Sequence, residues 1–170
     1  MKKGTLSEEG QNPDTLDHLD DALLDLYTER LMALNDAAKQ PTTLSRVDGY
    51  AEKRSRICGS TIRIDLAIDQ ASGLVTEISQ SVSACALGTA AAAILVKNAV
   101  GASLSDLETV RDQLANFLNG DGNLPPETRW QDIDVLAPAR DVRARHPAVR
   151  LPFEAAVDAM RKGLKHGEKR

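Results

Sequence analysis

Apolar and polar residues alternate along two neighbouring stretches in the middle of this chain. The stretches cover residues 61–69 and 74–82, and in both of them the alternate positions are mostly Ile, Leu or Val. A period of two places these side chains on one face of a β-strand. The loop between the stretches ends at Gly73, which can adopt a positive φ. The pattern therefore predicts an antiparallel hairpin with one solvent-exposed face and one apolar face that other elements must bury.

Apolar residues spaced three or four apart predict helices on both sides of this hairpin. Ser103 and Asp106 have the spacing of a capping box, which would start one of these helices. A short edge strand is also predicted around residues 50–53. Helices before and after a strand cluster indicate an α+β fold, so we expect a small antiparallel sheet of about three strands covered by four to five helices. The predicted helices cover residues 14–34, 84–100, 103–118, 130–137 and 151–164.

The 170 residues are enough for one domain with a substantial core. Residues 1–13 are polar and contain Gly and Pro, so we predict a disordered tail there and a single domain over residues 14–164. The basic residues 165–170 are predicted to be a frayed tail. The most apolar stretch, residues 84–100, is too short and too rich in alanine to span a bilayer, and no secretory signal is visible. We therefore expect a cytoplasmic protein that does not enter a membrane.

Composition argues against nucleic acid as a partner. The formal net charge is -4, which disfavours binding to a phosphate backbone. Aromatic residues make up only 3% of the chain, too few for stacking platforms that hold single-stranded bases.

Cys58 and Cys85 are the only cysteines, and each lies just outside the predicted hairpin. If the two strands pair, both thiols reach the same end of the hairpin. Two thiols at one edge can bind a soft metal or an iron–sulfur cluster. The alternative is that both are ordinary buried cysteines. In a cytosolic chain we expect them to be reduced.

The position of Cys85 favours reactive thiol chemistry. It closes a strand and opens a helix, where the helix dipole and unpaired amide groups would lower its pKa. We therefore expect Cys85 to favour the thiolate form, which ligates metal and attacks sulfur electrophiles. His146, which follows two arginines before the last predicted helix, is the third candidate ligand. A histidine in such a loop is usually on the surface, but it could reach the cysteines if that helix starts near the hairpin end.

Several short motifs, in order along the chain, resemble the NifU-like/IscU family of iron–sulfur cluster assembly scaffolds. The segments Cys58-Gly59-Ser60 and Ala84-Cys85-Ala86-Leu87-Gly88 are similar to its Cys-Gly-Asp and Gly-Cys-Ala-Ile-Ser motifs. The Leu26-Tyr27 pair, the alanines after Cys85 and the segment Arg145–Phe153 also have counterparts in the family. The match runs from about Leu23 to Leu164 and implies a fold of the SufE/NifU type.

Two positions depart from the family pattern. Ser60 stands where the family has an acid, and Ala148 stands where it has a third cysteine. The resemblance implies that Cys58, Cys85 and His146 are the ligands of this chain. A second subunit in a homodimer, or a partner's cysteine, could supply the rest.

The resemblance also implies a function. Such a scaffold is not an enzyme: it takes sulfur from a cysteine desulfurase, binds iron, and passes a labile [2Fe–2S] unit to iron–sulfur acceptor proteins. Because Cys85 lies at a predicted helix start, we expect it to be the thiol that accepts the sulfur. Two alternatives use the same fold. One is a zinc-binding sulfur acceptor, and the other is a metal-free docking module that regulates a desulfurase. A cysteine-dependent hydrolase is less favoured, because His146 is the only candidate base.

Overall fold

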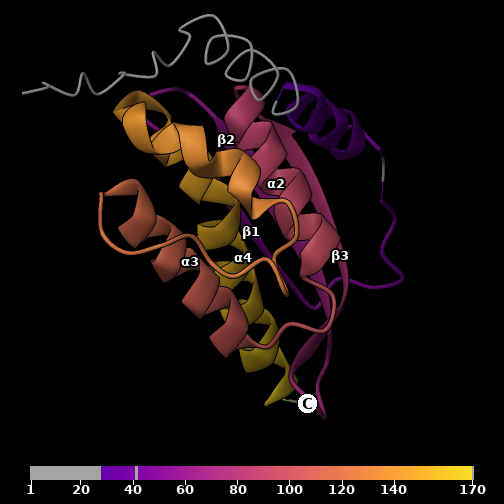
Figure 1. Cartoon of the computed structure of the whole chain (residues 1–170). Coiled ribbons are helices and arrows are strands. Elements are labelled where there is room, and N and C mark those ends of the chain that lie inside the picture. The colour runs from indigo at the N-terminus through magenta and orange to yellow at the C-terminus, as the bar shows by residue number, and fades with distance from the viewer. Residues whose placement is uncertain (1–27, 41, 170) are drawn as a thin grey trace, which may run out of the picture.

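The computed structural model describes residues 28–40 and 42–169 (Figure 1). Within them the strands form one antiparallel sheet in the order β1-β2-β3, and helices cover it. The predicted α+β fold with a small antiparallel sheet is confirmed. The predicted tail over residues 1–13 and most of the predicted first helix lie outside the described residues.

The elements are β1 (Gly49–Arg54), β2 (Thr61–Asp69), β3 (Leu74–Ser83), α2 (Ala86–Asn98), α3 (Leu104–Leu118), the 3-10 helices η1 (Ile133–Asp141) and η2 (Arg143–Arg145), and α4 (His146–Gly167). Residues 28–38 are also helical.

The hairpin forms as the alternating pattern predicts. The alternate residues Ile62, Ile64, Leu66 and Ile68 are buried. Three of these four residues have apolar cross-strand partners, namely Val82, Ile78 and Val75, whereas Ile64 pairs with Gln80. Gly73 closes the turn with a φ of 69°. The apolar face of this hairpin is the face that the helices cover.

Three layers build the molecule. Helix α4 packs on β1 and β2, α2 packs on β3, and α3 packs on the outer side of α4 (Figure 1). The contact between α4 and the sheet depends on two facing glycines. A Cβ at Gly49 would overlap the carbonyl oxygen of Ala159, and a Cβ at Gly163 would overlap Cδ1 of Ile68. The absence of both side chains lets the helix lie directly on the strands.

The predicted capping box at the start of α3 is confirmed. The Ser103 hydroxyl accepts from the amide of Asp106 at 3.2 Å, and the Ser103 amide donates to the Asp106 carboxylate at 2.8 Å. These two bonds satisfy backbone donors that a helix start leaves open.

The last helix begins earlier in the structure than the sequence pattern predicts. Helix α4 begins at His146, whereas the spacing of apolar residues predicts a start at Leu151. Pro147 lies in the first turn, where an amide hydrogen is not needed, so it does not break the helix. Ala148 and Val149 are buried there and extend the packed face. His146 is therefore the first residue of a helix and not part of a loop.

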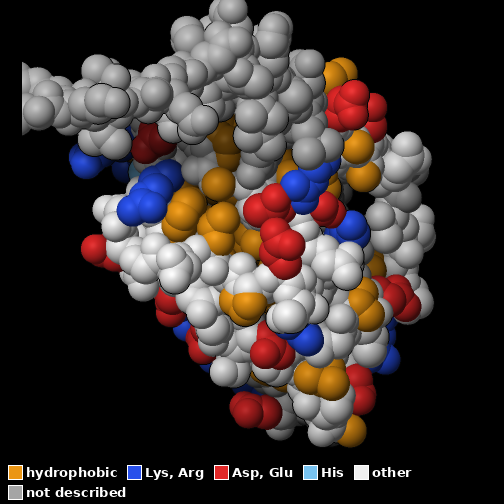
Figure 2. All heavy atoms as spheres, viewed as in Figure 1, with side chains coloured by type: hydrophobic (Ala, Val, Ile, Leu, Met, Phe, Trp, Pro, Cys, Tyr) orange, Lys and Arg blue, Asp and Glu red, His pale blue; other side chains and the backbone are white. Residues whose placement is uncertain are grey.

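Charged side chains of both signs are scattered over the face seen in Figure 2, with hydrophobic side chains between them. No helix in residues 28–40 or 42–169 is long and apolar enough to cross a membrane.

Candidate functional site

Both cysteines lie just beyond the same end of the β2–β3 ladder. Thr61 pairs with Ser83 at the last rung, and the chain reaches Cys58 shortly before Thr61 and Cys85 shortly after Ser83. Both cysteines are free thiols. The structure thus places the two candidate ligands at one end of the hairpin, as the strand pattern predicts.

A tight turn before β2 presents the first of these thiols. The Gly59 amide donates to the Ser55 carbonyl at 3.0 Å, and the Ser55 amide donates to the Ser60 carbonyl at 2.8 Å. Gly59 has a φ of 72°, which favours glycine at this point of the turn. The turn leaves Cys58 exposed, next to Ile57, which is 79% exposed.

Two serine hydroxyls surround the Cys58 sulfur. Hydrogen bonds from the Ser55 hydroxyl, and then from the Ser60 hydroxyl, lower the pKa of Cys58 to about 7. The Cys58 Sγ lies 3.1 Å from the Ser60 Oγ. Both serines are 5% exposed, so their hydroxyls are held in place beneath the thiol. A large fraction of Cys58 is therefore thiolate near neutral pH, and thiolate is the form that binds metal and attacks sulfur.

Ser55 is a functional residue that the sequence did not reveal. Ser60 is notable in the sequence only because it replaces an acid, whereas here its hydroxyl accepts a hydrogen bond from the thiol. The signal for Ser55 is its spacing, since it lies three residues before Cys58 and shares its turn. A serine that precedes a cysteine within one turn can place its hydroxyl on the sulfur, and this spacing could have indicated the interaction.

Cys85 caps the N-terminus of α2. Its backbone is extended, with φ of -64° and ψ of 169°, and its carbonyl accepts from the Thr89 amide at 2.9 Å. Its side chain makes no capping hydrogen bond and is half-buried. Cys85 thus stands at the start of the helix, as the sequence predicts.

The first turn of α4 lies against the first turn of α2. A Cβ at Gly88 would lie 2.9 Å from the Cβ of Ala84 and 3.0 Å from the Cβ of Ala148. Gly88 follows Cys85 by about one helical turn. Ala148, which stands where the resembling family has a third cysteine, is therefore close to the start of α2 and is 1% exposed.

His146 is anchored to the backbone of η1. Its Nε2 lies 2.9 Å from the Ala139 carbonyl oxygen and 3.1 Å from the Arg140 carbonyl oxygen. Carbonyl oxygens only accept, so Nε2 carries a hydrogen and Nδ1 is the nitrogen left for a ligand. Among the described residues, no group of three or more His, Cys, Asp or Glu side chains could hold a metal ion. The structure therefore does not gather Cys58, Cys85 and His146 into one three-ligand centre.

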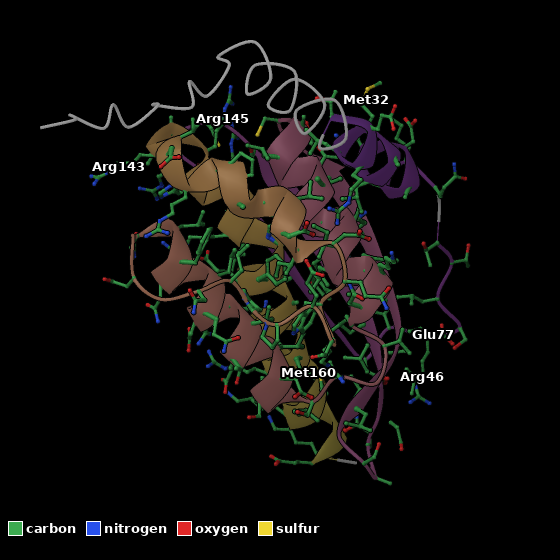
Figure 3. The ribbon with its side chains drawn as sticks, viewed as in Figure 1. Met32, Arg46, Glu77, Arg143, Arg145 and Met160 are labelled. Atoms are coloured by element: carbon green, nitrogen blue, oxygen red, sulfur yellow. The ribbon has the colours of Figure 1, made fainter. Side chains whose placement is uncertain are left out.

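Exposed arginines lie near this end of the molecule. Arg143 and Arg145 come immediately before α4 and project outward, far from Arg46 and Glu77 (Figure 3). Arg56 is exposed beside Cys58. These guanidinium groups make the surroundings of the site favourable for an anionic partner or substrate.

The fold and the site define a class: a small α+β domain with two free thiols at one end of a hairpin, one exposed and one at a helix start. The family model described as NifU-like N terminal domain matches residues 26–139 of this chain. The chain belongs to this family, and the resemblance inferred from the motifs is confirmed. The matched residues end before α4, so His146 and Ala148 lie beyond them.

Solved structures support the same assignment. The chain is 32% identical to a nitrogen-fixing NifU-like protein (N-terminal) from Brucella abortus, with a TM-score of 0.75, covering 86% of this chain and 97% of that one. A protein from Fervidobacterium islandicum AW-1, described as an iron–sulfur cluster assembly scaffold for the SUF system, has 14% identity and a TM-score of 0.68, covering 78% of this chain and 94% of that one. At that identity the second likeness shows the fold alone. No curated protein matches the chain.

Proposed function

We propose that this protein is an iron–sulfur cluster assembly scaffold that receives sulfur and iron on Cys58 and Cys85. It passes a [2Fe–2S] unit to acceptor proteins and acts as a carrier, not as an enzyme. Membership of the family described as NifU-like N terminal domain supports this assignment. The observation that carries it is the pair of free thiols at one hairpin end, one of them exposed with a pKa of about 7.

Sulfur is delivered by a cysteine desulfurase as a persulfide. The Cys58 thiolate attacks the outer sulfur of that persulfide, a new S–S bond forms on Cys58, and the desulfurase cysteine leaves as a thiolate. One sulfur atom moves between two thiols, so this step needs no external oxidant or reductant. Cys58 suits this step better than Cys85, because it is exposed and its thiolate is stabilised by two hydroxyls.

Iron is the second part of the cargo. Cys58 and Cys85 supply thiolates, and His146 can offer only Nδ1, since Nε2 donates to the η1 carbonyls. Cysteine thiolates are the usual ligands of such clusters, and histidine replaces them in some. The ligands still needed come from a partner or from a second subunit in a homodimer. An incomplete, open ligand set suits cargo that must leave for an acceptor in the cytoplasm.

A second function uses the same residues. Persulfide acceptance needs only one reactive thiol, and Cys58 alone meets that need. The protein would then be a sulfur acceptor, with or without zinc, that does not build a cluster. The lack of a three-ligand group among the described residues favours a sulfur acceptor without zinc.

Anaerobic reconstitution tests the proposal. The full chain is incubated with ferrous iron, cysteine and a cysteine desulfurase, and the visible spectrum is recorded. We expect charge-transfer absorbance that is lost in both C58A and C85A. A colourless protein that carries a persulfide on Cys58 by mass spectrometry supports the sulfur acceptor. A colourless protein without persulfide contradicts both functions.

A further inference from the structure

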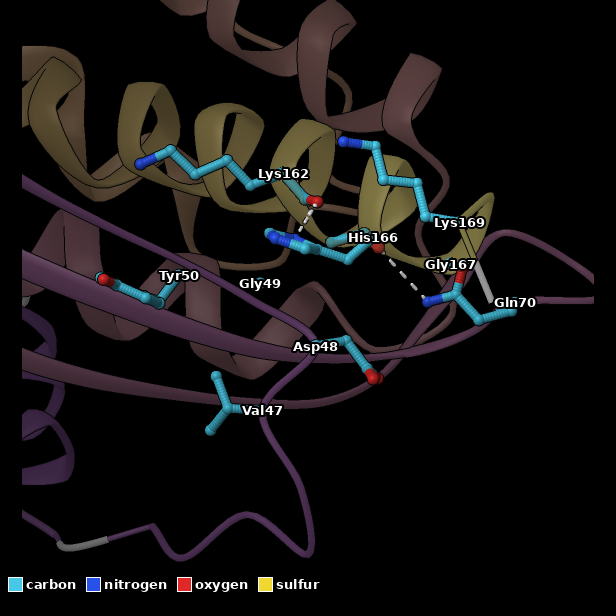
Figure 4. Close-up of a pocket in the computed structure, with 10 residues that line it drawn as sticks. Val47, Asp48, Gly49, Tyr50, Gln70, Lys162, His166, Gly167 and Lys169 are labelled. Carbon is cyan, nitrogen blue, oxygen red and sulfur yellow. Dashed lines mark hydrogen bonds between the residues drawn. The ribbon is translucent and has the colours of Figure 1, made fainter.

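A groove lies at the end of the molecule opposite the cysteines. It is formed between the start of β1 and the last turns of α4, and its volume is about 470 Å³ (Figure 4). Gly49 pairs with Leu66 at this end of β1, whereas Arg54 pairs with Thr61 at the cysteine end. Helix α4 likewise begins near Cys85 and ends here. The lining residues are Val47, Asp48, Gly49, Tyr50, Gln70, Lys162, Gly163, His166, Gly167 and Lys169.

The groove is basic on one wall. Lys162, His166 and Lys169 line it from α4 and the residues that follow, and none of the three pairs with a carboxylate within the described part of the chain. His166 donates from Nδ1 to the Lys162 carbonyl at 2.8 Å, which leaves Nε2 open (Figure 4). The last ten residues hold five Lys and Arg against one acid, in a chain with a net charge of -4. This cationic wall is a local feature of an acidic protein.

The one carboxylate in the groove is already engaged. Asp48 accepts from the Arg46 Nε at 2.8 Å and from the Ile68 amide at 2.7 Å. Its pairing with Arg46 offsets part of its negative charge. An anion that enters the groove meets the ammonium groups of Lys162 and Lys169.

The opposite wall is apolar. Val47 is 52% exposed and Tyr50 is 50% exposed. The Tyr50 ring is held by two cations, since the Arg63 guanidinium carbon lies 4.5 Å and the Lys162 Nζ lies 5.6 Å from its centroid. Gly49, Gly163 and Gly167 also line the groove, where α4 lies directly on β1.

We propose that this groove binds an acidic peptide segment of a partner protein. Carboxylates of the segment pair with Lys162 and Lys169, and an apolar side chain lies on Val47 and Tyr50. A peptide fits because β1 is an edge strand of the sheet, along which an extended segment can lie. The concave shape does not suit a membrane surface, and the overall negative charge does not suit nucleic acid. This inference is independent of the cysteine chemistry, because a segment bound here leaves the thiols free.

Fluorescence anisotropy of the full chain tests the proposal. The probe is a fluorescein-labelled dodecapeptide that repeats Glu-Asp-Leu, and a Lys-Arg-Leu repeat of equal length is the reversed-charge probe. We expect K162E/K169E to weaken binding of the acidic peptide about tenfold. The control R143E/R145E changes the charge equally at the other end of the molecule and should leave binding within about twofold. A Glu-Asp-Gly repeat should bind less tightly than Glu-Asp-Leu, because Val47 and Tyr50 then gain no contact.

Amide chemical shifts locate the peptide. We expect the acidic peptide to move the resonances of Tyr50, Gly163 and Gly167 and to leave that of Cys58 in place. Equal weakening by the two double variants would show unspecific attraction and overturn the proposal. Absence of peptide binding would also overturn it. Binding to phosphatidylserine vesicles but not to the peptide would overturn it in favour of a membrane surface. Circular dichroism confirms that each variant is folded.

Discussion

Two buried hydroxyls make the exposed Cys58 thiol acidic. A group whose pKa is lowered to about 7 reaches its thiolate form at a lower pH than a free cysteine. We expect Ser55→Ala to raise the Cys58 pKa and to slow iodoacetamide alkylation at neutral pH several-fold. The rate is measured against pH by mass spectrometry of the Cys58 peptide.

A matched serine provides the control for that measurement. Ser81 is exposed on β3 and lies outside the turn that holds Cys58, so Ser81→Ala should leave the alkylation profile unchanged. An unchanged profile in Ser55→Ala, or an equal shift in both variants, would contradict the role of the Ser55 hydroxyl.

Ala148 is the position at which a third thiol would have the greatest effect. Its Cβ approaches the first turn of α2, which carries Cys85 at its cap. If the proposed scaffold function holds, Ala148→Cys adds a ligand and should lengthen the lifetime of a reconstituted cluster several-fold. The lifetime is the decay of visible absorbance after a chelator is added. Ala144→Cys, an exposed thiol in η2, is the control, and equal lifetimes would contradict the placement.

An ion-pair network ties the helix at residues 28–38 to η1 and α2. Arg30 donates to Asp134 at 2.6 Å and to Asp132 at 2.9 Å, and Lys97 donates to Asp132 at 2.7 Å. Arg30 holds the pKa of Asp134 below its usual range, and Lys97 followed by Arg30 does the same for Asp132. The network is only partly exposed, so we expect Arg30→Gln to lower the free energy of unfolding by about 1–2 kcal/mol at neutral pH.

The pH dependence of that loss has a definite sign. A carboxylate whose folded pKa is lowered adds stability above its unfolded pKa and loses it as pH falls through the folded value. The difference between wild type and Arg30→Gln in urea unfolding should therefore shrink below about pH 4. Lys39→Gln removes an exposed pair with Asp36 at the end of the same helix and should change stability by less than about 0.5 kcal/mol. A pH-independent loss would contradict the ionic origin.

Gly163 shows how packing can override helix propensity. Alanine in a helix interior is normally more stable than glycine by about 0.5–1 kcal/mol. Here a Cβ would overlap Cδ1 of Ile68 and lie 3.2 Å from the Gly49 amide nitrogen, so the helix must move off the sheet. We expect Gly163→Ala to lower the free energy of unfolding by about 1–3 kcal/mol in urea titrations.

Gly167 is the comparison for that substitution. A Cβ there would meet only the end of the flexible Gln70 side chain, which can turn away. Gly167→Ala should therefore be close to neutral. Equal losses in the two variants would show that helix geometry, and not the close approach of α4 to the sheet, sets the effect.

Local patterns predicted much of the fold, whereas contacts between distant residues escaped them. The hairpin and the Ser103 cap depend on residues a few positions apart, so their spacing alone reveals them. The apolar spacing predicts a later start for α4 than His146, because the packing of Ala148 against α2 is a contact between distant residues. The site was predictable to the extent that strand pairing brings Cys58 and Cys85 to one end. The Ser55 hydroxyl, the η1 carbonyls that hold His146, and the Arg30 network each require the folded backbone.

The two ends of the molecule differ in chemistry, and helix α4 connects them. Its first turn lies beside the cap of α2 that carries Cys85, and its last turns line the basic groove. If thiol chemistry and peptide binding are separate functions, occupation of the groove should leave sulfur transfer unaffected. We therefore expect a saturating concentration of the Glu-Asp-Leu peptide to change the rate of persulfide formation on Cys58 by less than about twofold, since charges this far apart are screened at physiological salt. K162E/K169E should accept sulfur at the wild-type rate, whereas C58A should accept none at that position. The rate is followed by mass spectrometry with a cysteine desulfurase as donor. Inhibition by the peptide in wild type but not in K162E/K169E would show that the groove controls the cysteine end, and inhibition in both would place the peptide near the thiols.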